Sequence, residues 1–328
     1  MKAIVFEKYG SPDVLEFKEV DKPLPKEHDV LIKVLAASIN SWDGDLLKGT
    51  PFINRLMFGI RKPTRIKILG CDIAGCVEAI GKKVKRFQTG DEVFGDISRS
   101  GWGGFAEYVC ANEKAFALKP ARMTFEEVAA VPQAAVLALQ GLRKGQIQKE
   151  QHTPAQKVLI NGASGGVGSF AVPMAKSLGA EVTGVCSTKK MEFVGSLGAD
   201  HVIDYTNEDF TKNSQQYDLI LDVMGHHSFF DYKRALSPKG IYVMVGGDSS
   251  LANKLLFLGP WISMIEGKKM GLLMHKPNAN DLNYMKTLFD AGTVFPVIDK
   301  CFPLSETAEA FRYYGEGRAK GKVVITME

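Results

Sequence analysis

The amino-acid sequence predicts an α/β protein with two domains, one built from short strands and one containing a doubly wound parallel sheet. Three observations support this prediction. The 328 residues are enough for two separate hydrophobic cores. Short strands punctuated by glycine fill the first third of the chain, and the pattern changes near residue 122. From Lys157 onward, short apolar strands alternate with helices, which is typical of a parallel sheet covered on both faces.

Short apolar runs separated by turns make up the first third of the chain. Glycines such as Gly81, Gly90 and Gly95 lie between these runs and mark the turns. The pattern indicates a compact domain that is all-β or mixed. Its strands are expected at 30–35, 73–80, 92–94 and 106–109.

A helical segment opens the second part of the chain. Thr124 and Glu127 have the spacing of a capping box, so we expect a helix over 128–142. Further helices are expected at 167–178, 191–197 and 228–236. The apolar strands between them are expected at 158–160, 182–185, 201–203, 219–221 and 241–245.

The last fifty residues return to the mixed pattern of the first part. Helices are expected at 282–291 and at 305–315, the second capped by Ser305, and a strand at 322–325. We therefore expect one domain made of residues 1–122 and 277–328. A second domain, residues 123–276, is inserted in it.

The charge balance does not favour a nucleic acid or an anionic membrane as a partner. The chain has 41 basic and 37 acidic residues, a small and scattered excess of +4. No stretch approaches the roughly 20 apolar residues that span a bilayer. The segment Met1–Glu7 is expected to be a first strand and not a signal peptide. The cytoplasm is therefore the expected location.

A glycine-rich turn, Gly162-Ala163-Ser164-Gly165-Gly166-Val167-Gly168, joins an expected strand to an expected helix. Gly165 would let the backbone approach a pyrophosphate, and Gly168 would let the helix pack closely on the strand. Amides at the positive end of the helix would face the phosphates. A purely structural turn is the alternative, and Pro173 predicts a kink in the helix. The residues expected to bind a dinucleotide here are Ala163, Ser164, Gly165, Gly166, Val167 and Gly168, with Ala163 in place of the usual first glycine.

The end of the second strand of this domain indicates NADPH as the cofactor. Sites for NADH usually place Asp or Glu there, about 20 residues after the glycine turn. This chain has Ser187, Thr188, Lys189 and Lys190, whose hydroxyls and ammonium groups suit a 2′-phosphate. The alternative is that Ser187 and Thr188 cap the next helix while the lysines are solvated.

Several motifs together resemble the medium-chain dehydrogenase/reductase superfamily, and within it the zinc-free quinone oxidoreductase branch. The resemblance covers nearly the whole chain. Its carriers are Gly70-Cys71-Asp72-Ile73-Ala74-Gly75, Val77-Glu78-Ala79-Ile80-Gly81, Gly90-Asp91-Glu92-Val93, Gly104-Phe105-Ala106-Glu107-Tyr108-Val109, the turn 163–168, Leu197-Gly198-Ala199-Asp200 and Asp204-Tyr205.

The resemblance implies a GroES-like barrel as the catalytic domain, a Rossmann domain, and an active-site cleft between them. It implies that Ser187, Lys190 and Tyr205 surround the adenosine 2′-phosphate. It also implies that the segment around Gly225 and the turn Val245-Gly246-Gly247 line the cofactor.

The resemblance indicates that this chain has no catalytic zinc. Zinc-dependent relatives place a Cys where this chain has Asn40 or Ser41, a His-Glu pair at Cys71-Asp72, and another Cys near Gln133. Only Cys71 and Asp72 could coordinate a metal here, and no His or second Cys completes a tetrahedral set. The chain has five cysteines and no C-x-x-C pair, which argues against a structural zinc site as well.

Asn40 and Asp43 match the branch's Asn-x-x-Asp element beside the nicotinamide. We expect Asn40 to orient a substrate carbonyl or the carboxamide, and Asp43 to have an orienting role and not that of an acid. Trp42 and Trp102 are expected at the substrate. An ordinary polar turn and ordinary aromatic packing are the alternatives. Leu137 stands where the family often has Thr, which leaves the usual hydrogen-bond relay without that hydroxyl.

These features predict hydride transfer from NADPH to a small-molecule acceptor. Without zinc there is no strong Lewis acid, so the acceptor must already be electrophilic, as a quinone or an α,β-unsaturated carbonyl is. We find no convincing general acid and expect protonation by solvent. The alternatives are an alcohol or aldehyde dehydrogenase of the same superfamily and an NADPH-binding protein with a sensing or structural role.

Two further segments have open interpretations. Residues 51–60 are apolar and unlike a regular strand, and could form a lid over the cleft or ordinary core or interface packing. Residues 269–274 could be an edge strand that pairs across a two-fold axis, which favours a homodimer.

Overall fold

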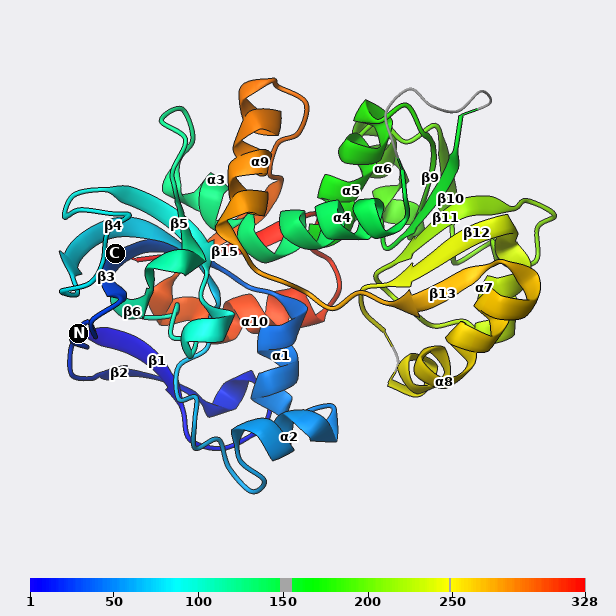
Figure 1. The fold of residues 1–328 in the computed structure, drawn as a ribbon. Coiled ribbons are helices and arrows are strands. Elements are labelled where there is room, and N and C mark those ends of the chain that lie inside the picture. Colours follow the sequence, from blue (N-terminus) through cyan, green and yellow to red (C-terminus); the bar gives the residue numbers. More distant parts are fainter. Residues whose placement is uncertain (148–154, 248, 328) are drawn as a thin grey trace. The chain divides into compact units, whose positions relative to one another are not determined.

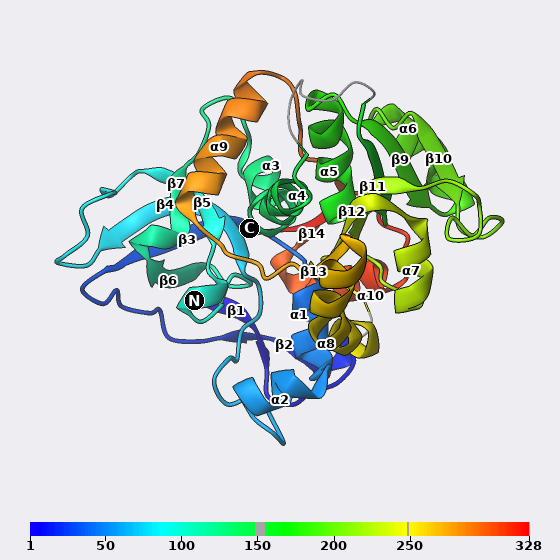
Figure 2. The ribbon, with the colours of Figure 1, turned by 45° about the vertical axis from the view of Figure 1, so that its right-hand side comes forward.

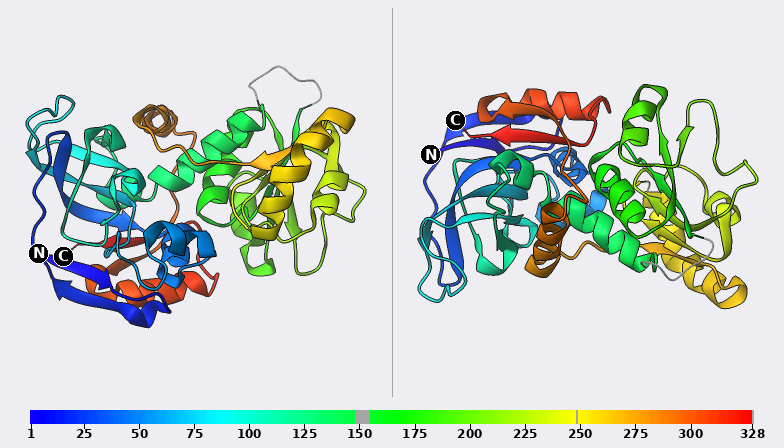
Figure 3. Two further views of the ribbon diagram at one scale, coloured as in Figure 1. Left: turned by 60° about the horizontal axis from the view of Figure 1, so that its bottom comes forward. Right: turned by 90° about the horizontal axis from the view of Figure 1, so that it is seen from above.

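The computed structural model describes residues 1–147, 155–247 and 249–327, which form two compact units. Unit 1 consists of Met1–Ala134, Pro277–Thr287 and Pro296–Glu328, and unit 2 of Ala135–Lys276 and Leu288–Phe295. The first and last strands of the chain both belong to unit 1 (Figure 3). The domain limits given above, 1–122 with 277–328 and 123–276, stay a prediction.

A sheet of seven strands forms the centre of unit 1, in the order β14-β15-β3-β4-β5-β7, with β6 paired to β3. The long strand β3 pairs with β6 over its first half and with β15 over its second half, so two neighbours share one of its edges. The seven strands are β3 (Asp29–Ser38), β4 (Asp72–Ile80), β5 (Glu92–Asp96), β6 (Tyr108–Asn112), β7 (Phe116–Leu118), β14 (Ile298–Pro303) and β15 (Lys322–Thr326). Strands β1 (Lys2–Phe6) and β2 (Leu15–Glu19) form a separate antiparallel pair.

Two helices follow β3 directly. Helix α1 (Ser41–Lys48) begins at the N-cap residue Asn40 with a capping box and ends at Gly49, whose φ of 65° is left-handed. Helix α2 (Phe52–Phe58) comes next in the segment whose structure the sequence left open. The other helices with residues in unit 1 are α3 (Phe125–Ala129), α4 (Pro132–Lys144), α9 (Ala279–Asp290) and α10 (Thr307–Gly315); α4 and α9 also have residues in unit 2.

Unit 2 contains a parallel sheet with the strand order β10-β9-β8-β11-β12-β13, the doubly wound order of a Rossmann fold. Helices α5 and α6 cover one face and α7 and α8 the other (Figure 1). The elements are β8 (Lys157–Asn161), α5 (Gly166–Ser177), β9 (Glu181–Cys186), α6 (Met191–Ser196), β10 (His201–Asp204), β11 (Tyr217–Asp222), α7 (Phe229–Ala235), β12 (Leu236–Met244), α8 (Ser249–Glu266) and β13 (Lys269–Leu272).

Two local predictions differ from the structure. The helix expected over 128–142 is two helices, because α3 ends at Ala129 and Pro132 starts α4. Ser305 does not cap a helix: it lies inside a 3₁₀ turn, and α10 begins at Thr307. The capping box of Thr124 with Glu127 is confirmed. None of the described helices combines the length and the apolar character needed to cross a bilayer.

Candidate functional site

The glycine turn of unit 2 leaves backbone amides without partners. Strand β8 ends at Asn161, and α5 begins at Gly166 after the N-cap residue Gly165, which has no side chain to cap the helix. Among the described residues, no group accepts a hydrogen bond from the amides of Gly166, Val167 or Gly168. The first amides of a helix, together with the positive end of its dipole, are suited to bind a phosphate.

Two glycines in the turn are required for different reasons. A Cβ on Gly168 would lie 2.3 Å from the Gly162 carbonyl oxygen and 2.5 Å from Ala163 Cα, so only glycine lets α5 pack this closely. A Cβ on Gly165 would meet nothing nearer than 3.6 Å, so its outer side is open. Ala163 itself is fully buried, and its amide donates to the Val185 carbonyl oxygen at 3.0 Å. The turn is therefore packed on its inner side and open on its outer side, which fits a cofactor diphosphate.

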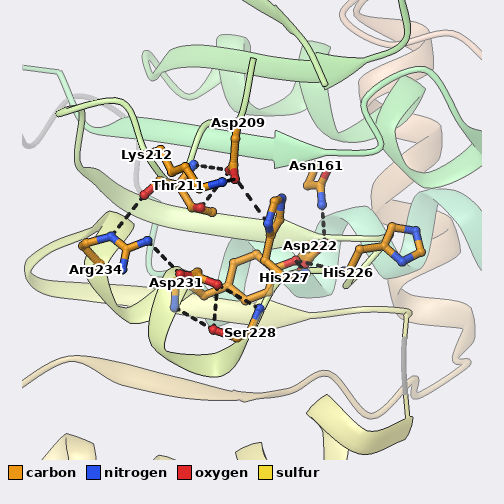
Figure 4. A network of polar contacts seen from close by, with 11 residues as sticks. Asn161, Asp209, Thr211, Lys212, Asp222, His226, His227, Ser228, Asp231 and Arg234 are labelled. Carbon is orange, nitrogen blue, oxygen red and sulfur yellow. Dashed lines mark hydrogen bonds and ion pairs between the residues drawn. The ribbon is translucent and has the colours of Figure 1, made fainter. Parts of the chain in front are cut away.

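Asp222, a fully buried residue at the end of β11, connects the segments around this turn (Figure 4). Its Oδ1 accepts hydrogen bonds from Asn161 Nδ2 and from the Gly225 amide, both at 2.8 Å. Its Oδ2 accepts one from the Tyr242 hydroxyl at 2.6 Å. Sequence analysis missed this residue, although an aspartate ending an apolar strand beside the glycine turn was a usable signal.

The turn after β12 completes this edge of the sheet. The Val245 amide donates to the Asp222 carbonyl oxygen at 2.7 Å. A Cβ on Gly247 would lie 2.5 Å from Gly225 Cα, so the two backbones touch. The structure therefore brings Gly225, Val245, Gly246 and Gly247 together beyond the carboxyl ends of β11 and β12.

A polar network braces the loop that follows Gly225 (Figure 4). The Tyr232 hydroxyl accepts hydrogen bonds from the amides of His226 and His227 at 3.2 and 3.3 Å. The His227 ring nitrogen Nδ1 lies 3.8 Å from an Asp209 carboxylate oxygen. Burial raises the pKa of Asp209, but hydrogen bonds from groups including Thr211 outweigh it and lower that pKa to about 2. The loop is therefore held from both ends.

The residues expected at the 2′-phosphate lie at one edge of the same sheet. Strands β9 and β10 end at Cys186 and Asp204, which are paired in register. Ser187 and Tyr205 follow directly, and the Tyr205 amide donates to the Cys186 carbonyl oxygen at 3.1 Å. The Lys190 amide donates to the Ser187 carbonyl oxygen at 2.9 Å. The structure thus groups Ser187, Lys190 and Tyr205 at neighbouring strand ends.

A carboxylate that the sequence pattern did not predict lies beside this group. Asp204 Oδ2 accepts a hydrogen bond from the Thr188 hydroxyl at 2.5 Å, and its Oδ1 accepts one from the Thr206 hydroxyl at 2.8 Å. These bonds, the one from Thr188 most of all, lower the pKa of Asp204. The Thr188 hydroxyl is therefore engaged, which leaves Ser187 as the hydroxyl open to a phosphate. Ser187 makes no side-chain capping bond.

In unit 1, Asn40 and Asp43 stand at the start of α1. Asp43 is fully buried, and its carboxylate accepts hydrogen bonds from the backbone amides of Asn40 at 2.8 Å and Gly70 at 2.9 Å. Burial raises the pKa of Asp43 to about 7. The carboxylate therefore fixes the start of α1 against the segment that precedes β4, which is compatible with an orienting role.

Asn40, Cys71 and Gln133, at positions where zinc-dependent relatives have metal ligands, lie together around the Cys71 thiol. Asn40 Nδ2 and Gln133 Nε2 each lie 3.6 Å from Cys71 Sγ. Asn40 Nδ2 also donates to Asp72 Oδ2 at 3.0 Å, and Asn40 Oδ1 accepts from Lys322 Nζ at 2.5 Å. Both ends of the Asn40 amide are engaged inside unit 1, which weighs against the prediction that it orients a substrate carbonyl.

Lys322, the first residue of β15, is a buried cation that sequence analysis missed. Its side chain is 3% exposed, and its Nζ donates to the Ile39 carbonyl oxygen at 3.0 Å and lies 3.8 Å from Asp72 Oδ2. Burial lowers the pKa of Lys322, against the charge of Asp72, and burial raises the pKa of Asp72 to about 6. The sequence shows only a lysine at the start of an apolar strand. Such a lysine is common at exposed strand ends, so it does not indicate burial.

The side chains at this cluster do not fit a catalytic zinc ion. In the described part of the chain, Cys71, Asp72 and Asp96 are the one group of three that could bring ligand atoms within 4.8 Å of one another. Burial raises the pKa of the Cys71 thiol well above its usual value, which disfavours the thiolate that zinc binds. The Lys322 ammonium also places a positive charge 3.8 Å from Asp72 Oδ2, which disfavours a second cation there.

The two tryptophans expected at the substrate pack against each other. The rings of Trp42 and Trp102 meet edge to face with centroids 5.0 Å apart. Trp102 is 4% exposed and belongs to the core of unit 1, so little of its ring is open to a ligand. Trp102 and Tyr108 also line an open pocket of about 560 Å³. Asn40 is not among the residues that line this pocket. Leu137 is half-buried on α4.

Models of two protein families match this chain. The alcohol dehydrogenase GroES-like domain matches residues 26–121, and the zinc-binding dehydrogenase model matches residues 197–325. The first match lies within unit 1, and together with the parallel sheet of unit 2 it confirms the predicted fold class.

Several proteins are similar to this chain over its full length. A chloroplast envelope quinone oxidoreductase homolog from Arabidopsis thaliana is 33% identical over 99% of this chain and 98% of its own length. An NADPH-dependent alkenal/one oxidoreductase from the same plant is 32% identical over 99% of this chain and 79% of its own. The solved quinone oxidoreductase of Coxiella burnetii superposes with a TM-score of 0.88 at 28% identity, over 100% of this chain and 99% of that one.

Replacing Lys322 with Met should lower the free energy of unfolding by about 3–5 kcal/mol, because Asp72 would be left buried without a counter-charge. Urea unfolding at neutral pH measures this. The double variant Lys322→Met/Asp72→Asn should recover much of the loss, and the exposed control Lys82→Met should change it by less than about 0.5 kcal/mol. Equal losses in the single and double variants would refute the pairing.

The free energy of unfolding should fall as the pH rises from about 5 to 7.5. The pKa of Asp43 is about 7 in the folded protein, against an ordinary 3.8, so the folded state holds a proton that the unfolded state has released. This stabilisation is complete below about pH 4 and is lost as the pH passes 7; between pH 5 and 7.5 the fall is roughly 2–3 kcal/mol. Urea unfolding of the Asp43→Asn variant should show a smaller fall; an identical pH profile would exclude Asp43 as the cause.

Proposed function

Because this chain is an oxidoreductase that belongs to the quinone oxidoreductase branch of the medium-chain dehydrogenase/reductase superfamily, we propose that it transfers a hydride from NADPH to a quinone or an α,β-unsaturated carbonyl compound. One observation carries the proposal. The unpartnered amides of residues 166–168 lie after β8, where the strand order of unit 2 changes direction. In doubly wound sheets, ligands bind outside the carboxyl ends of the strands at that place.

The residues of unit 2 would bind and orient the cofactor. The amides of Gly166, Val167 and Gly168 would hold its diphosphate, while Asp222 keeps Gly225 and the end of β8 in fixed positions. When bound, NADPH supplies the hydride, and the protein supplies position. A site whose parts are fixed before binding loses less entropy when the ligand binds.

A preference for NADPH over NADH rests on the group at the ends of β9 and β10. Ser187 offers a hydroxyl and Lys190 an ammonium, and Tyr205 is 62% exposed beside them. The charge of Asp204 opposes a second anion, but hydrogen bonds from the Thr188 and Thr206 hydroxyls and from the Asn207 side-chain amide occupy both oxygens of its carboxylate. The name of the alkenal/one oxidoreductase relative agrees with NADPH.

The electrophilic substrate class follows from the cluster around Cys71. Its one buried thiol, its amides and the Lys322 ammonium do not make a Lewis-acid site, so we propose that the reaction needs no zinc. Hydride would add to the β-carbon of an enone or to a quinone, the electron pair would move to the carbonyl oxygen, and solvent would supply the proton. Asn40 and Asp43 would shape the site from the start of α1, and the half-buried Trp42 and the small exposed part of Trp102 would face the substrate.

A second candidate function is an NADPH-binding protein with a sensing or structural role and little turnover. The observation that favours it is Leu137, which has no hydroxyl where the family often has one.

Two further proposals concern the oligomeric state and the location of the protein. Strand β13 is an edge strand of the sheet of unit 2 and would pair across a two-fold axis in a homodimer. The cytoplasm is the proposed location.

The purified chain should oxidise NADPH in the presence of quinones or enals, and should do so equally after treatment with EDTA. Loss of NADPH absorbance across a panel of quinones, enals and ketones measures this, and a gain of absorbance from NADP⁺ with alcohols tests for alcohol oxidation. Turnover confined to alcohols, or turnover abolished by EDTA and restored by zinc, would refute the proposed chemistry. Tight NADPH binding without turnover on any acceptor would favour the second candidate.

Replacing Lys190 with Ala should weaken NADPH binding roughly ten-fold or more and NADH binding by less than about two-fold, because a charged hydrogen bond to the 2′-phosphate is lost. Fluorescence titration with each nucleotide measures both. Lys189→Ala, in the exposed neighbouring position, is the matched control and should have a smaller effect. Equal losses of NADPH and NADH binding in Lys190→Ala would contradict the assignment.

A further inference from the structure

Helix α2 exposes a contiguous group of large apolar side chains. Phe52, Ile53, Leu56, Met57 and Ile60 are between 49% and 62% exposed. Their spacing puts Phe52, Ile53, Leu56 and Met57 on one side of the helix, and Ile60 follows Gly59, which ends it. Figures 1 and 2 show α2 projecting from the rest of unit 1. Single exposed apolar residues are ordinary, but a contiguous group of this kind marks a surface that contacts something.

The opposite side of α2 is fixed to the protein. Asn54 is 6% exposed, and its Nδ2 donates to the Thr50 carbonyl oxygen at 2.7 Å. Phe58 packs against the core of unit 1, and the Tyr9 hydroxyl donates to the Gly59 carbonyl oxygen at 2.7 Å. These contacts hold the helix with its apolar side outward.

Basic residues lie before, within and after α2 in the sequence. Between Asp45 and Asp72 the sequence contains six basic residues and no acidic residue, more positive charge than the +4 of the whole chain. None of the six forms an ion pair with a carboxylate in the described part of the chain. The excess of basic residues is therefore locally concentrated, contrary to the expectation that it is scattered. Five of the six are exposed, namely Lys48, Arg61, Lys62, Arg65 and Lys67.

We propose that this apolar and basic patch, made of the four apolar residues of α2, Ile60 and the five exposed cations, docks the protein on the surface of an anionic lipid bilayer. Apolar side chains can enter the boundary between headgroups and acyl chains while nearby cations contact anionic headgroups. Each part of the patch then has a partner. A nucleic acid would leave the apolar residues in water, and a second copy of this chain on the same face would bring like charges together. A lid over a substrate would leave the cations without a role.

Co-sedimentation of the full chain with lipid vesicles tests the proposal. The chain should bind vesicles that contain phosphatidylglycerol and phosphatidylcholine, and should not bind phosphatidylcholine alone. Added salt should weaken the binding, because screening shortens the range of the charge interaction. Failure to bind the anionic vesicles at low salt would overturn the proposal.

Two pairs of variants assign the binding to the patch. Arg61→Glu/Lys62→Glu should lower the partition coefficient about ten-fold or more, whereas the exposed pair Lys82→Glu/Lys85→Glu should lower it by less than about three-fold. Ile53→Ser/Leu56→Ser should also lower it about ten-fold or more, and Leu24→Ser, at an 85% exposed position outside the patch, should leave it unchanged. Thermal melts check that each variant is folded.

Other occupants of α2 predict different outcomes. Vesicle binding that is the same in the patch variants and their controls would overturn the proposal. So would a patch variant that changes the KM for an enone while the unaltered chain shows no vesicle binding, which would assign α2 as a lid. A mass in light scattering that falls from dimer to monomer in Ile53→Ser/Leu56→Ser, without vesicle binding, would assign the patch to a second copy.

Discussion

The close packing of α5 on the turn after β8 is the contact on which the candidate cofactor site depends. Because Gly168 has no side chain, the first turn of α5 approaches Gly162 and Ala163 at distances that any other residue would prevent. This approach aims the free amides of residues 166–168 outward, along the edge where β11 and β12 also end. Asp222 then fixes the neighbouring segment around Gly225 relative to β8. Anion binding at this edge follows from backbone geometry and needs few side chains.

In unit 1, side chains and not backbone amides determine the chemistry at the positions where zinc-dependent relatives hold metal. An amide, a thiol and a second amide from Asn40, Cys71 and Gln133 fill that place, and the Lys322 ammonium supplies the positive charge near Asp72. A buried ammonium stabilises a carboxylate, but it is not a Lewis acid with open coordination positions. The ammonium therefore balances the charge of the buried Asp72, and the lack of a Lewis acid among these side chains agrees with proposed substrates that are already electrophilic.

Features set by short stretches of sequence could be predicted, and features set by distant contacts could not. The glycine turn, the capping box of Thr124 and the alternation of strands and helices in unit 2 are local patterns, and the structure contains each of them. The cluster around Cys71 joins residues 40, 71, 133 and 322; the family resemblance grouped the first three, but no local pattern links Lys322 to them. Helices α1 and α2 were missed because they are short and α2 exposes its apolar side, which gives no core-facing period. The engagement of Thr188 by Asp204 likewise depends on the pairing of β9 with β10.

The binding of the cofactor diphosphate by the backbone amides of residues 166–168 is tested most directly by NMR of those amides. In a titration of ¹⁵N-labelled protein with NADP⁺, the largest shifts of the amide signals should fall on Gly166, Val167, Gly168 and Gly225, with smaller changes at Ser187 and Tyr205. Saturation of the protein with nucleotide while the signals of residues 166–168 stay in place would contradict the account.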